Sequence, residues 1–236
     1  MNLNWTTIDV DGAPMKVRGC VTEQADAPAV ILYMHAPGVD RFMEAMAQRL
    51  AQAGYAAYVP DLYYRQGQSE EDPLERMGRL RDAELEADVA AVQRHVADRG
   101  HRRIAAAGFC MGGRIALIAA SVLPSLDAVV SFYGGFIRES WGEGAPPIAR
   151  AASITCPAFL IGGKEDTNPS PDDITALSNA LDAEGNPPQV SVFDDVGHAF
   201  LNFSRPGYRD DIAMRAWREF ERFLSIHLRG ASLKAP

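Results

Sequence analysis

The chain has 236 residues, of which 47% are hydrophobic and 23% charged, and its formal net charge is −8. These proportions are typical of a globular protein, and no apolar run approaches the roughly 18 residues that a membrane span needs, so we expect no membrane partner. The negative charge, without a local cluster of Lys or Arg, argues against binding to nucleic acid through its phosphates.

The length predicts one domain that spans residues 1–236, because α/β domains of this size commonly remain undivided. The three cysteines, Cys20, Cys110 and Cys156, cannot all pair, and none is spaced from another as in a zinc site. The segment MNLNWTTIDV has neither the basic nor the apolar stretch of a secretory signal or transit peptide. We therefore expect a reducing, cytoplasmic location and no metal ion.

The first part of the chain predicts a hairpin and then a buried strand. Residues 5–10 and 15–21 are β-rich runs around Asp11-Gly12, a pair that favours a tight turn, so they predict an antiparallel hairpin at the sheet edge. Residues 29–34 form a continuous apolar run, as in a strand that is covered on both faces. The next predicted elements are a helix over residues 42–53 and a strand over residues 55–59.

After a polar surface loop over residues 66–72, predicted helices and strands alternate. The helices cover residues 85–96, 114–120, 172–181 and 210–228, and the strands cover residues 104–107, 128–133, 157–161 and 189–193. This alternation predicts an α/β fold with a mostly parallel central sheet, whose ligands gather at the carboxyl ends of the strands. The irregular stretch over residues 134–155 is too short for a lid domain, and His95 and His101 are expected to be exposed.

The stretch Gly108-Phe109-Cys110-Met111-Gly112-Gly113 joins a predicted strand to a predicted helix through a sharp turn. Such a turn leaves no room for side chains beside its apex, which explains the glycines two positions before and after Cys110. At the amino end of a helix, free N–H groups and the helix dipole favour the thiolate form of a cysteine. The pattern is that of a nucleophile elbow, although a small buried cysteine in a structural turn would leave the same pattern.

A cysteine nucleophile needs a base and a third group that orients the base. Cys110, Asp166 and His198 follow predicted strands in the order nucleophile, acid, histidine, which is the order in α/β-hydrolases. His198 is the predicted base, because the other histidines lie on or beside helices or, like His35, precede the nucleophile. The fallback choices for the acid are Asp194 and Asp195.

Thiolate attack on a carbonyl would create an oxyanion that two backbone N–H groups should stabilise. One N–H is predicted to come from Met111, directly after the nucleophile, and the other from the loop that follows residues 29–34. Ala36 is the candidate in that loop, because Pro37 has no N–H to donate. A thiolate attacks activated esters well, so we expect ester or lactone bonds to be cleaved ahead of amides.

Four stretches together resemble the dienelactone hydrolase family of the α/β-hydrolase superfamily. They are the elbow, Pro60-Asp61-Leu62-Tyr63-Tyr64-Arg65, the turn from Gly163 to Asp166, and Val196-Gly197-His198-Ala199-Phe200 before Arg205-Pro206. The resemblance covers about residues 29–228. It implies an α/β-hydrolase fold, no cofactor, and a Cys-His-Asp triad that opens a small-molecule lactone or ester through a thioester acyl-enzyme.

The resemblance also implies that His35, Arg65, Tyr64 and Phe200 contact the substrate. Where the family's founding enzymes carry a glutamate that engages the resting thiol, this chain has His35. That histidine could pair with Cys110 and promote the thiolate, or it could simply line the pocket.

The resemblance implies a site for a substrate carboxylate, but only part of that site is present in this sequence. Arg65 matches an arginine that binds a substrate carboxylate, although a surface ion pair with Asp61 or a nearby glutamate would explain it equally well. Ala199 and Asn202 stand where the family enzyme has a serine and a second arginine. Either Arg205 compensates for the missing arginine, or the natural substrate carries no carboxylate.

Two functions of other classes stay open at this stage. The chain could be a catalytically silent α/β-hydrolase relative that binds a ligand, or a thiol-redox protein in which Cys110 oxidises reversibly. No Cys-x-x-Cys motif supports the redox alternative. We expect a monomer or a small homo-oligomer.

Overall fold

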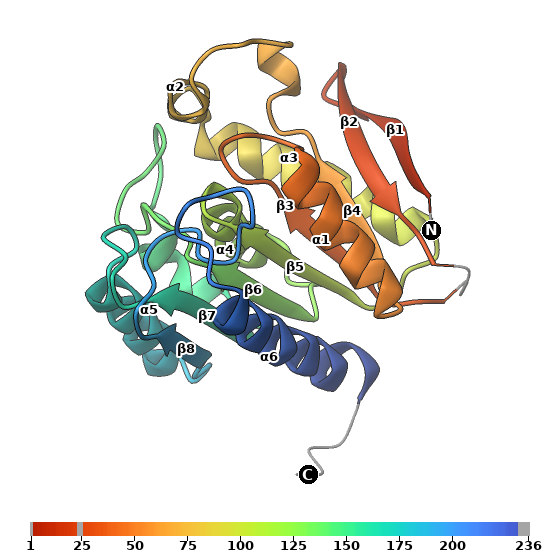
Figure 1. Ribbon diagram of the computed structural model, residues 1–236. Coiled ribbons are helices and arrows are strands. Elements are labelled where there is room, and N and C mark those ends of the chain that lie inside the picture. The colour runs from red at the N-terminus through yellow and green to blue at the C-terminus, as the bar shows by residue number, and fades with distance from the viewer. Residues whose placement is uncertain (1, 23–25, 231–236) are drawn as a thin grey trace.

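The computed structural model describes residues 2–22 and 26–230, and an eight-stranded sheet forms its centre (Figure 1). The strands are β1 (Leu3–Val10), β2 (Ala13–Cys20), β3 (Ala29–Tyr33), β4 (Ala56–Pro60), β5 (Ile104–Phe109), β6 (Ala128–Phe132), β7 (Ala158–Gly163) and β8 (Gln189–Phe193). Their order across the sheet is β1-β2-β4-β3-β5-β6-β7-β8, and strands β3 to β8 are parallel. The expected mostly parallel α/β sheet is confirmed.

The N-terminal hairpin is also confirmed. β1 pairs antiparallel with β2 along its whole length, and β2 pairs antiparallel with β4. Asp11 and Gly12 have φ angles of 53° and 84°. Positive φ at both central residues matches the twist of the two strands, which is why this pair favours tight hairpins.

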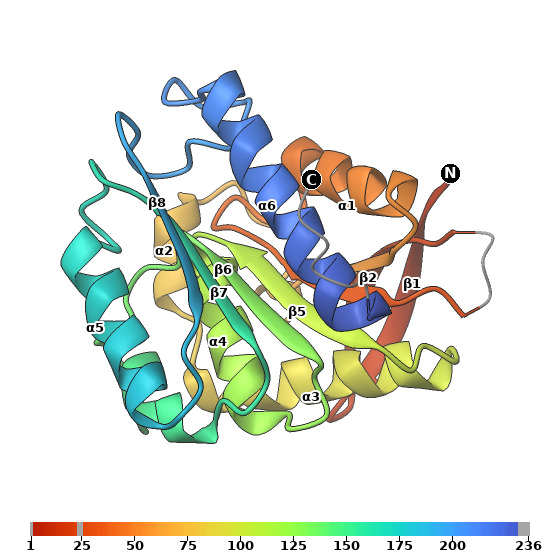
Figure 2. The same cartoon turned by 90° about the horizontal axis from the view of Figure 1, so that it is seen from below.

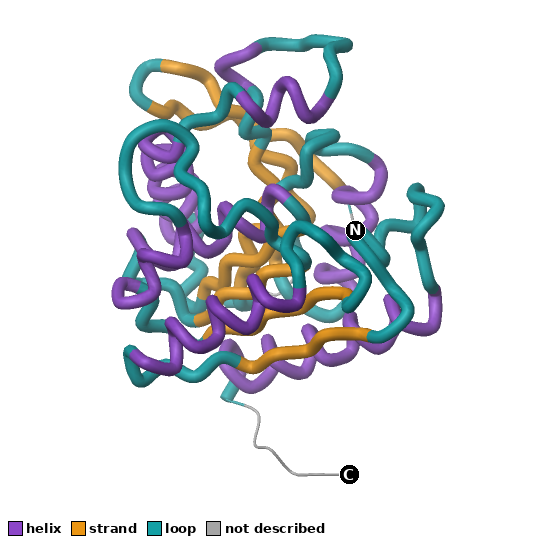
Figure 3. The backbone as a smooth tube through the Cα atoms, turned by 90° about the vertical axis from the view of Figure 1, so that its left-hand side faces the viewer, coloured by secondary structure: helices purple, strands orange, loops and turns teal. Residues whose placement is uncertain are grey.

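Helices cover both faces of the sheet. Figure 2 shows α1 (Arg41–Gln52) and α6 (Asp210–Arg229) on one face, with α3 (Asp82–Asp98), α4 (Met111–Val122) and α5 (Pro171–Ala183) on the other. The tube in Figure 3 likewise shows the strands in the middle of the molecule with helices around them. Because both faces are covered, strands β3 to β7 are buried along their whole length, which explains their continuous apolar sequences.

The last helix, α6, ends at Arg229, one residue after the end predicted from the sequence. Trp217, Phe220 and Leu224 are buried on its inner face, and the Phe220 ring packs edge to face on Phe132 of β6 at 5.1 Å. No helix among residues 2–22 and 26–230 has both the length and the apolar character that crossing a membrane requires.

Two features differ from the sequence-based expectations. Three short helices were not predicted, namely η1 (Tyr64–Gln66), α2 (Pro73–Gly78) and η2 (Pro147–Ser153). The prediction that His101 is exposed is wrong: it is 5% exposed, and its ring nitrogens lie 2.8 Å from the Tyr58 hydroxyl and 2.7 Å from the Ala27 carbonyl oxygen. A buried histidine whose two nitrogens both have partners is satisfied, and the sequence cannot reveal such distant partners.

Candidate active site

Cys110 lies at the sharp turn between β5 and α4, at the amino end of the helix. Its φ and ψ are 55° and −120°, a strained conformation for a residue with a Cβ atom. The turn is held by a hydrogen bond of 2.9 Å from the Cys110 N–H to the carbonyl oxygen of Phe132 on the neighbouring strand. The half-buried thiol is thereby raised above the carboxyl end of the sheet.

The glycines around this turn have a steric role. A Cβ atom on Gly108 would lie 2.1 Å from the Gly112 carbonyl oxygen, and one on Gly112 would lie 2.0 Å from the carbonyl oxygen of Tyr33 on β3. Neither backbone atom can move without opening the sheet or the helix. The close approach of α4 to β3 and β5 therefore requires glycine at both positions.

A buried ion pair fixes α4, the helix that follows the elbow, to its neighbours. Arg114, one turn into α4, makes a two-pronged ion pair with Asp82 at 2.6 and 2.9 Å, and both side chains are fully buried. The guanidinium also donates to the Glu139 carbonyl oxygen at 2.8 Å, and Asp82 accepts from the Trp141 N–H at 3.0 Å. These bonds tie α4 to α3 and to the loop after β6.

His198 and Asp166 meet at the ends of the strands beside Cys110. Nδ1 of His198, after β8, lies 2.8 Å from Oδ2 of Asp166, after β7. The buried carboxylate also accepts a hydrogen bond of 2.9 Å from the Asn168 N–H, whereas 37% of the His198 side-chain surface is exposed. A buried, doubly bonded carboxylate holds the imidazole in one orientation, with Nε2 left for another partner.

The protonation of His198 is coupled to both neighbours. Burial alone would lower its pKa, but hydrogen bonds and electrostatic attraction to Asp166 and Cys110 outweigh burial and raise the pKa to about 10. The imidazolium is therefore favoured at neutral pH, next to the sulfur.

Two adjoining pockets open over the thiol. The main pocket, of ≈380 Å³, is lined by His35, Ala36, Pro37, Leu74, Cys110, Tyr133, His198, Ala199, Asn202, Arg205, Pro206 and Gly207. The adjacent pocket, of ≈220 Å³, is lined by Leu74, Met77, Cys110, Met111, Gly135, Phe136, Asp166, Thr167, Asn168 and His198. Cys110 and His198 line both pockets, so each pocket gives a small molecule access to these two residues.

The N–H groups of Ala36 and Met111 donate no hydrogen bond within the part of the chain that the structure describes. The peptide that carries the Ala36 N–H is held from its other side, since the His35 carbonyl oxygen accepts from the Gly38 N–H at 2.9 Å. Ala36 lines the main pocket and Met111 the adjacent one, and Cys110 lines both. Two N–H donors without a partner among the described residues, in pockets that include the cysteine, suit the stabilisation of an oxyanion.

Tyr133, which no sequence pattern marked as a site residue, also lines the main pocket. Its φ is 40°, its ring packs edge to face on His198 at 5.2 Å, and its buried hydroxyl has no hydrogen-bond partner among the described residues. Burial, together with the nearby Cys110 and Asp166, raises the pKa of Tyr133 well above its usual value. The hydroxyl therefore keeps its proton beside the site.

The comparison with known families agrees with this geometry. The family model described as "Dienelactone hydrolase family" matches residues 17–228, which is most of the chain. The chain belongs to the dienelactone hydrolase family.

Relatives of this family include a Salmonella typhimurium protein named "Putative carboxymethylenebutenolidase", which is 30% identical over 81% of this chain and 74% of its own. Among solved structures, "Putative Dienelactone Hydrolase" from Klebsiella pneumoniae has a TM-score of 0.86 and 28% identity, covering 95% of this chain and 97% of that one. A dienelactone hydrolase-like promiscuous phosphotriesterase from metagenomic libraries has a TM-score of 0.81 at 20% identity, covering 96% and 98%. The last likeness concerns the fold alone.

Two positions expected from the family resemblance lie away from the pockets. Arg65 donates from Nη1 to both carboxylate oxygens of Asp88, at 2.8 and 3.0 Å, and the Tyr64 hydroxyl donates to the same carboxylate at 2.8 Å. Neither residue lines the main or the adjacent pocket. The ion-pair interpretation of Arg65 fits the structure, but the partner is Asp88 of α3 rather than Asp61 or a glutamate.

Of the remaining positions expected to contact the substrate, one lines a pocket and the other does not. His35 lines the main pocket with Ala199, Asn202 and Arg205. Phe200 is fully buried and lines neither pocket, because its ring packs behind Tyr133 at a centroid distance of 5.5 Å. In this structure the rim cation is thus Arg205 and not Arg65.

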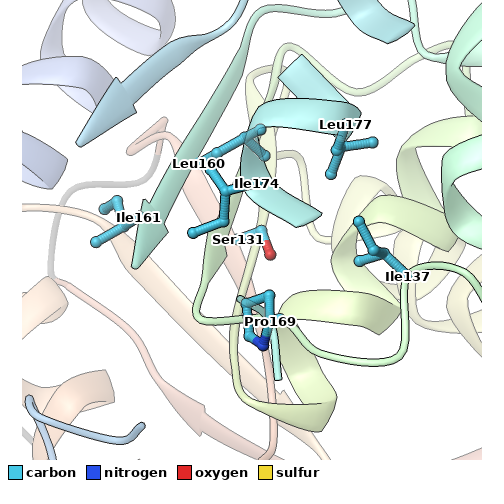
Figure 4. Close-up of a pocket in the computed structure, with 8 residues that line it drawn as sticks. Ser131, Ile137, Leu160, Ile161, Pro169, Ile174 and Leu177 are labelled. Carbon is cyan, nitrogen blue, oxygen red and sulfur yellow. The ribbon is translucent and has the colours of Figure 1, made fainter. Parts of the chain in front are cut away.

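A small cavity also lies away from Cys110. It has a volume of ≈10 Å³ and lies between β7 and α5. Figure 4 shows the side chains that line it, which are apolar apart from Ser131. It has room for about one water molecule and includes none of the residues discussed above. Cys20 and Cys156 are buried, and neither lines the main or the adjacent pocket. Among the described residues, no cluster of three or more His, Cys, Asp or Glu side chains could hold a metal ion.

Proposed function

We propose that this member of the dienelactone hydrolase family is a cofactor-independent hydrolase that opens a lactone or ester bond through a thioester on Cys110. One observation carries the proposal: the strained, half-buried Cys110 shares its pocket with His198, whose imidazole is oriented by the buried Asp166. A nucleophile, a base and an orienting acid are the groups that acyl transfer requires.

In the acylation half, the sulfur of Cys110 bonds to the substrate carbonyl carbon while His198 holds the thiol proton. The carbonyl electron pair moves to oxygen, and the N–H groups of Ala36 and Met111 stabilise that negative charge. When the tetrahedral intermediate collapses, the carbon–oxygen bond breaks and His198 gives its proton to the leaving alkoxide. In a lactone, that alcohol remains attached to the acyl group.

In the second half, water attacks the thioester carbonyl and His198 accepts one of its protons. The same two N–H groups stabilise the new oxyanion, and collapse breaks the carbon–sulfur bond. The products are a carboxylic acid and the resting cysteine. The role of Asp166 in both halves is to hold the imidazole in one orientation and to balance its charge.

A chromogenic ester such as p-nitrophenyl acetate tests the proposal. We expect a burst of nitrophenol, with an acetyl group on Cys110 in the mass spectrum of the quenched protein, and loss of the burst in Cys110→Ala and His198→Ala. Cys156→Ala is the matched control, because this buried thiol lies outside both pockets. Failure to react with any activated ester or lactone would favour a silent, ligand-binding relative instead.

A further inference from the structure

The hydroxyl of Tyr63 lies where three segments around the site meet. It is 2.8 Å from the Ala36 carbonyl oxygen, 3.5 Å from Sδ of Met111 and 3.5 Å from the Pro73 carbonyl oxygen. Ala36 and Met111 are the residues whose N–H groups we propose as the oxyanion donors, and Pro73 begins α2, which contributes Leu74 and Met77 to the pockets. Tyr63 itself is only 2% exposed and lines neither pocket.

A tyrosine hydroxyl has one proton to donate, and the shortest of these contacts receives it. The Tyr63 proton therefore goes to the Ala36 carbonyl oxygen, while Met111 packs against the hydroxyl. This bond fixes the peptide group after Ala36, and the bond from the Gly38 N–H to the His35 carbonyl oxygen fixes the peptide group before it. With both peptide groups held, the Ala36 N–H has one direction available.

Tyr63 is itself firmly placed. Its N–H donates to Oδ1 of Asp61 at 3.0 Å, and the guanidinium carbon of Arg76 lies 4.3 Å from the centre of its ring. Burial raises the pKa of Tyr63, so the hydroxyl stays protonated and remains a donor. The first contact fixes the backbone of Tyr63, and the ring cannot turn away without losing the second.

We propose that Tyr63 is a positioning residue for the oxyanion site: its hydroxyl locks the Ala36 loop against Met111, so that both N–H donors face the same point above Cys110. This inference rests on the proposed function, because an oxyanion forms only if the cysteine attacks a carbonyl. Tyr63 would act through Ala36 and Met111 without touching the substrate.

The proposal separates two reactions of the same sulfur. Ester cleavage develops charge on a carbonyl oxygen and needs the two donors, whereas alkylation of Cys110 by iodoacetamide displaces iodide and forms no oxyanion. Loss of the Tyr63 hydroxyl should therefore slow acylation and spare alkylation. Complete removal of one oxyanion donor costs about 10² to 10³ in rate, so a donor that is present but misaligned should cost on the order of tenfold.

Tyr63→Phe tests this, with Tyr58→Phe as the matched control. Tyr58 is an equally buried tyrosine whose hydroxyl lies 2.8 Å from His101, so its loss removes a buried hydrogen bond far from either pocket. We expect Tyr63→Phe to lower kcat and the burst rate for p-nitrophenyl acetate about tenfold, with KM and the rate of Cys110 alkylation unchanged. Tyr58→Phe should match the wild type in all of these rates, and thermal melting of both variants checks that each is folded.

The outcomes are distinct. If Tyr63→Phe cleaves the ester as fast as Tyr58→Phe, or if alkylation falls in step with acylation, the positioning role is wrong while the proposed function stands. If the wild type forms no acyl-enzyme with any activated ester or lactone, the proposed function itself is overturned, and the role of Tyr63 with it.

Discussion

Nε2 of His35 lies 3.0 Å from Oδ2 of Asp40, so the histidine that follows β3 is paired with a carboxylate at the edge of the main pocket. Asp40 also caps α1 by accepting from the Met43 N–H at 3.0 Å. Burial alone would raise the pKa of Asp40. The interaction with His35 and the hydrogen bonds from backbone N–H groups outweigh burial, so the pKa of Asp40 is lowered. Of the two roles expected for His35, the pairing with Asp40 favours lining the pocket over engaging the thiol.

His35→Ala should therefore leave the pH dependence of Cys110 alkylation unchanged. Its Nε2 is paired with Asp40, whereas the imidazole that is coupled to the sulfur is that of His198. Iodoacetamide rates measured across the pH range provide the test, with His198→Ala as the variant in which the profile moves. A shift to higher pH in His35→Ala would mean that this histidine promotes the thiolate.

Asp166→Asn should lower kcat for ester cleavage by about 10³-fold or more, with little change in KM. The amide keeps the volume and can still accept from the Asn168 N–H, but it favours the wrong tautomer of His198 and cannot balance the imidazolium. Asp194→Asn is the control, because this alternative acid lies on the surface in an ion pair with Lys164. If Asp194→Asn lost activity while Asp166→Asn kept it, the acid that orients His198 would be Asp194 and not Asp166.

The imidazole of His198 should remain protonated at neutral pH and titrate near 10. Since the pKa is raised from 6.5, the stability that the imidazolium contributes is fully present below about 6.5 and is lost as the pH rises through about 10. In Cys110→Ala the hydrogen bond and attraction to sulfur are gone, so the titration midpoint should fall. Nitrogen NMR of the labelled ring measures both midpoints, and an identical midpoint would show that the sulfur and imidazole are uncoupled.

The elbow and the order of the site residues could be predicted because they depend on local sequence. Glycines flank Cys110 since α4 approaches the strands too closely for a Cβ atom. Asp166 follows a continuous apolar strand, and His198 follows a strand in which polar and apolar residues alternate. Parallel strands then bring their carboxyl ends to one edge of the sheet.

The partners of polar groups could not be predicted, because tertiary packing selects them. Nothing near Arg65 in sequence marks Asp88, 23 residues away on another helix, as its partner. Tyr133 looks like the last residue of an apolar strand, and nothing in the sequence marks its positive φ or the contact of its ring with His198. Helix α2 was missed because its six residues are too few for a periodic apolar pattern.

Arg65→Met should lower the free energy of unfolding by about 1–2 kcal/mol and leave ester cleavage almost unchanged. Asp88 is buried and its pKa is raised by that burial, so losing the guanidinium leaves the carboxylate with Tyr64 as its remaining side-chain donor. We expect only this small loss in the free energy of unfolding, because 29% of the Arg65 side-chain surface is exposed and water screens the ion pair. Urea unfolding and kcat/KM measure the two effects, and a large rise in KM at constant stability would place Arg65 in substrate binding after all.

Arg205→Met should raise KM for an ester that carries a carboxylate by about fivefold, and leave KM for the matching uncharged ester unchanged. Arg205 lines the main pocket, and its guanidinium has no hydrogen-bond or ion-pair partner in the described part of the chain. Because the side chain is exposed, water screens the attraction, and an exposed pair is worth up to about 1 kcal/mol. The ratio of the two KM values in wild type and variant isolates the charge effect from any change in pocket shape. Equal ratios would mean that Arg205 does not bind the carboxylate, and that charge recognition must come from elsewhere or is not part of this site.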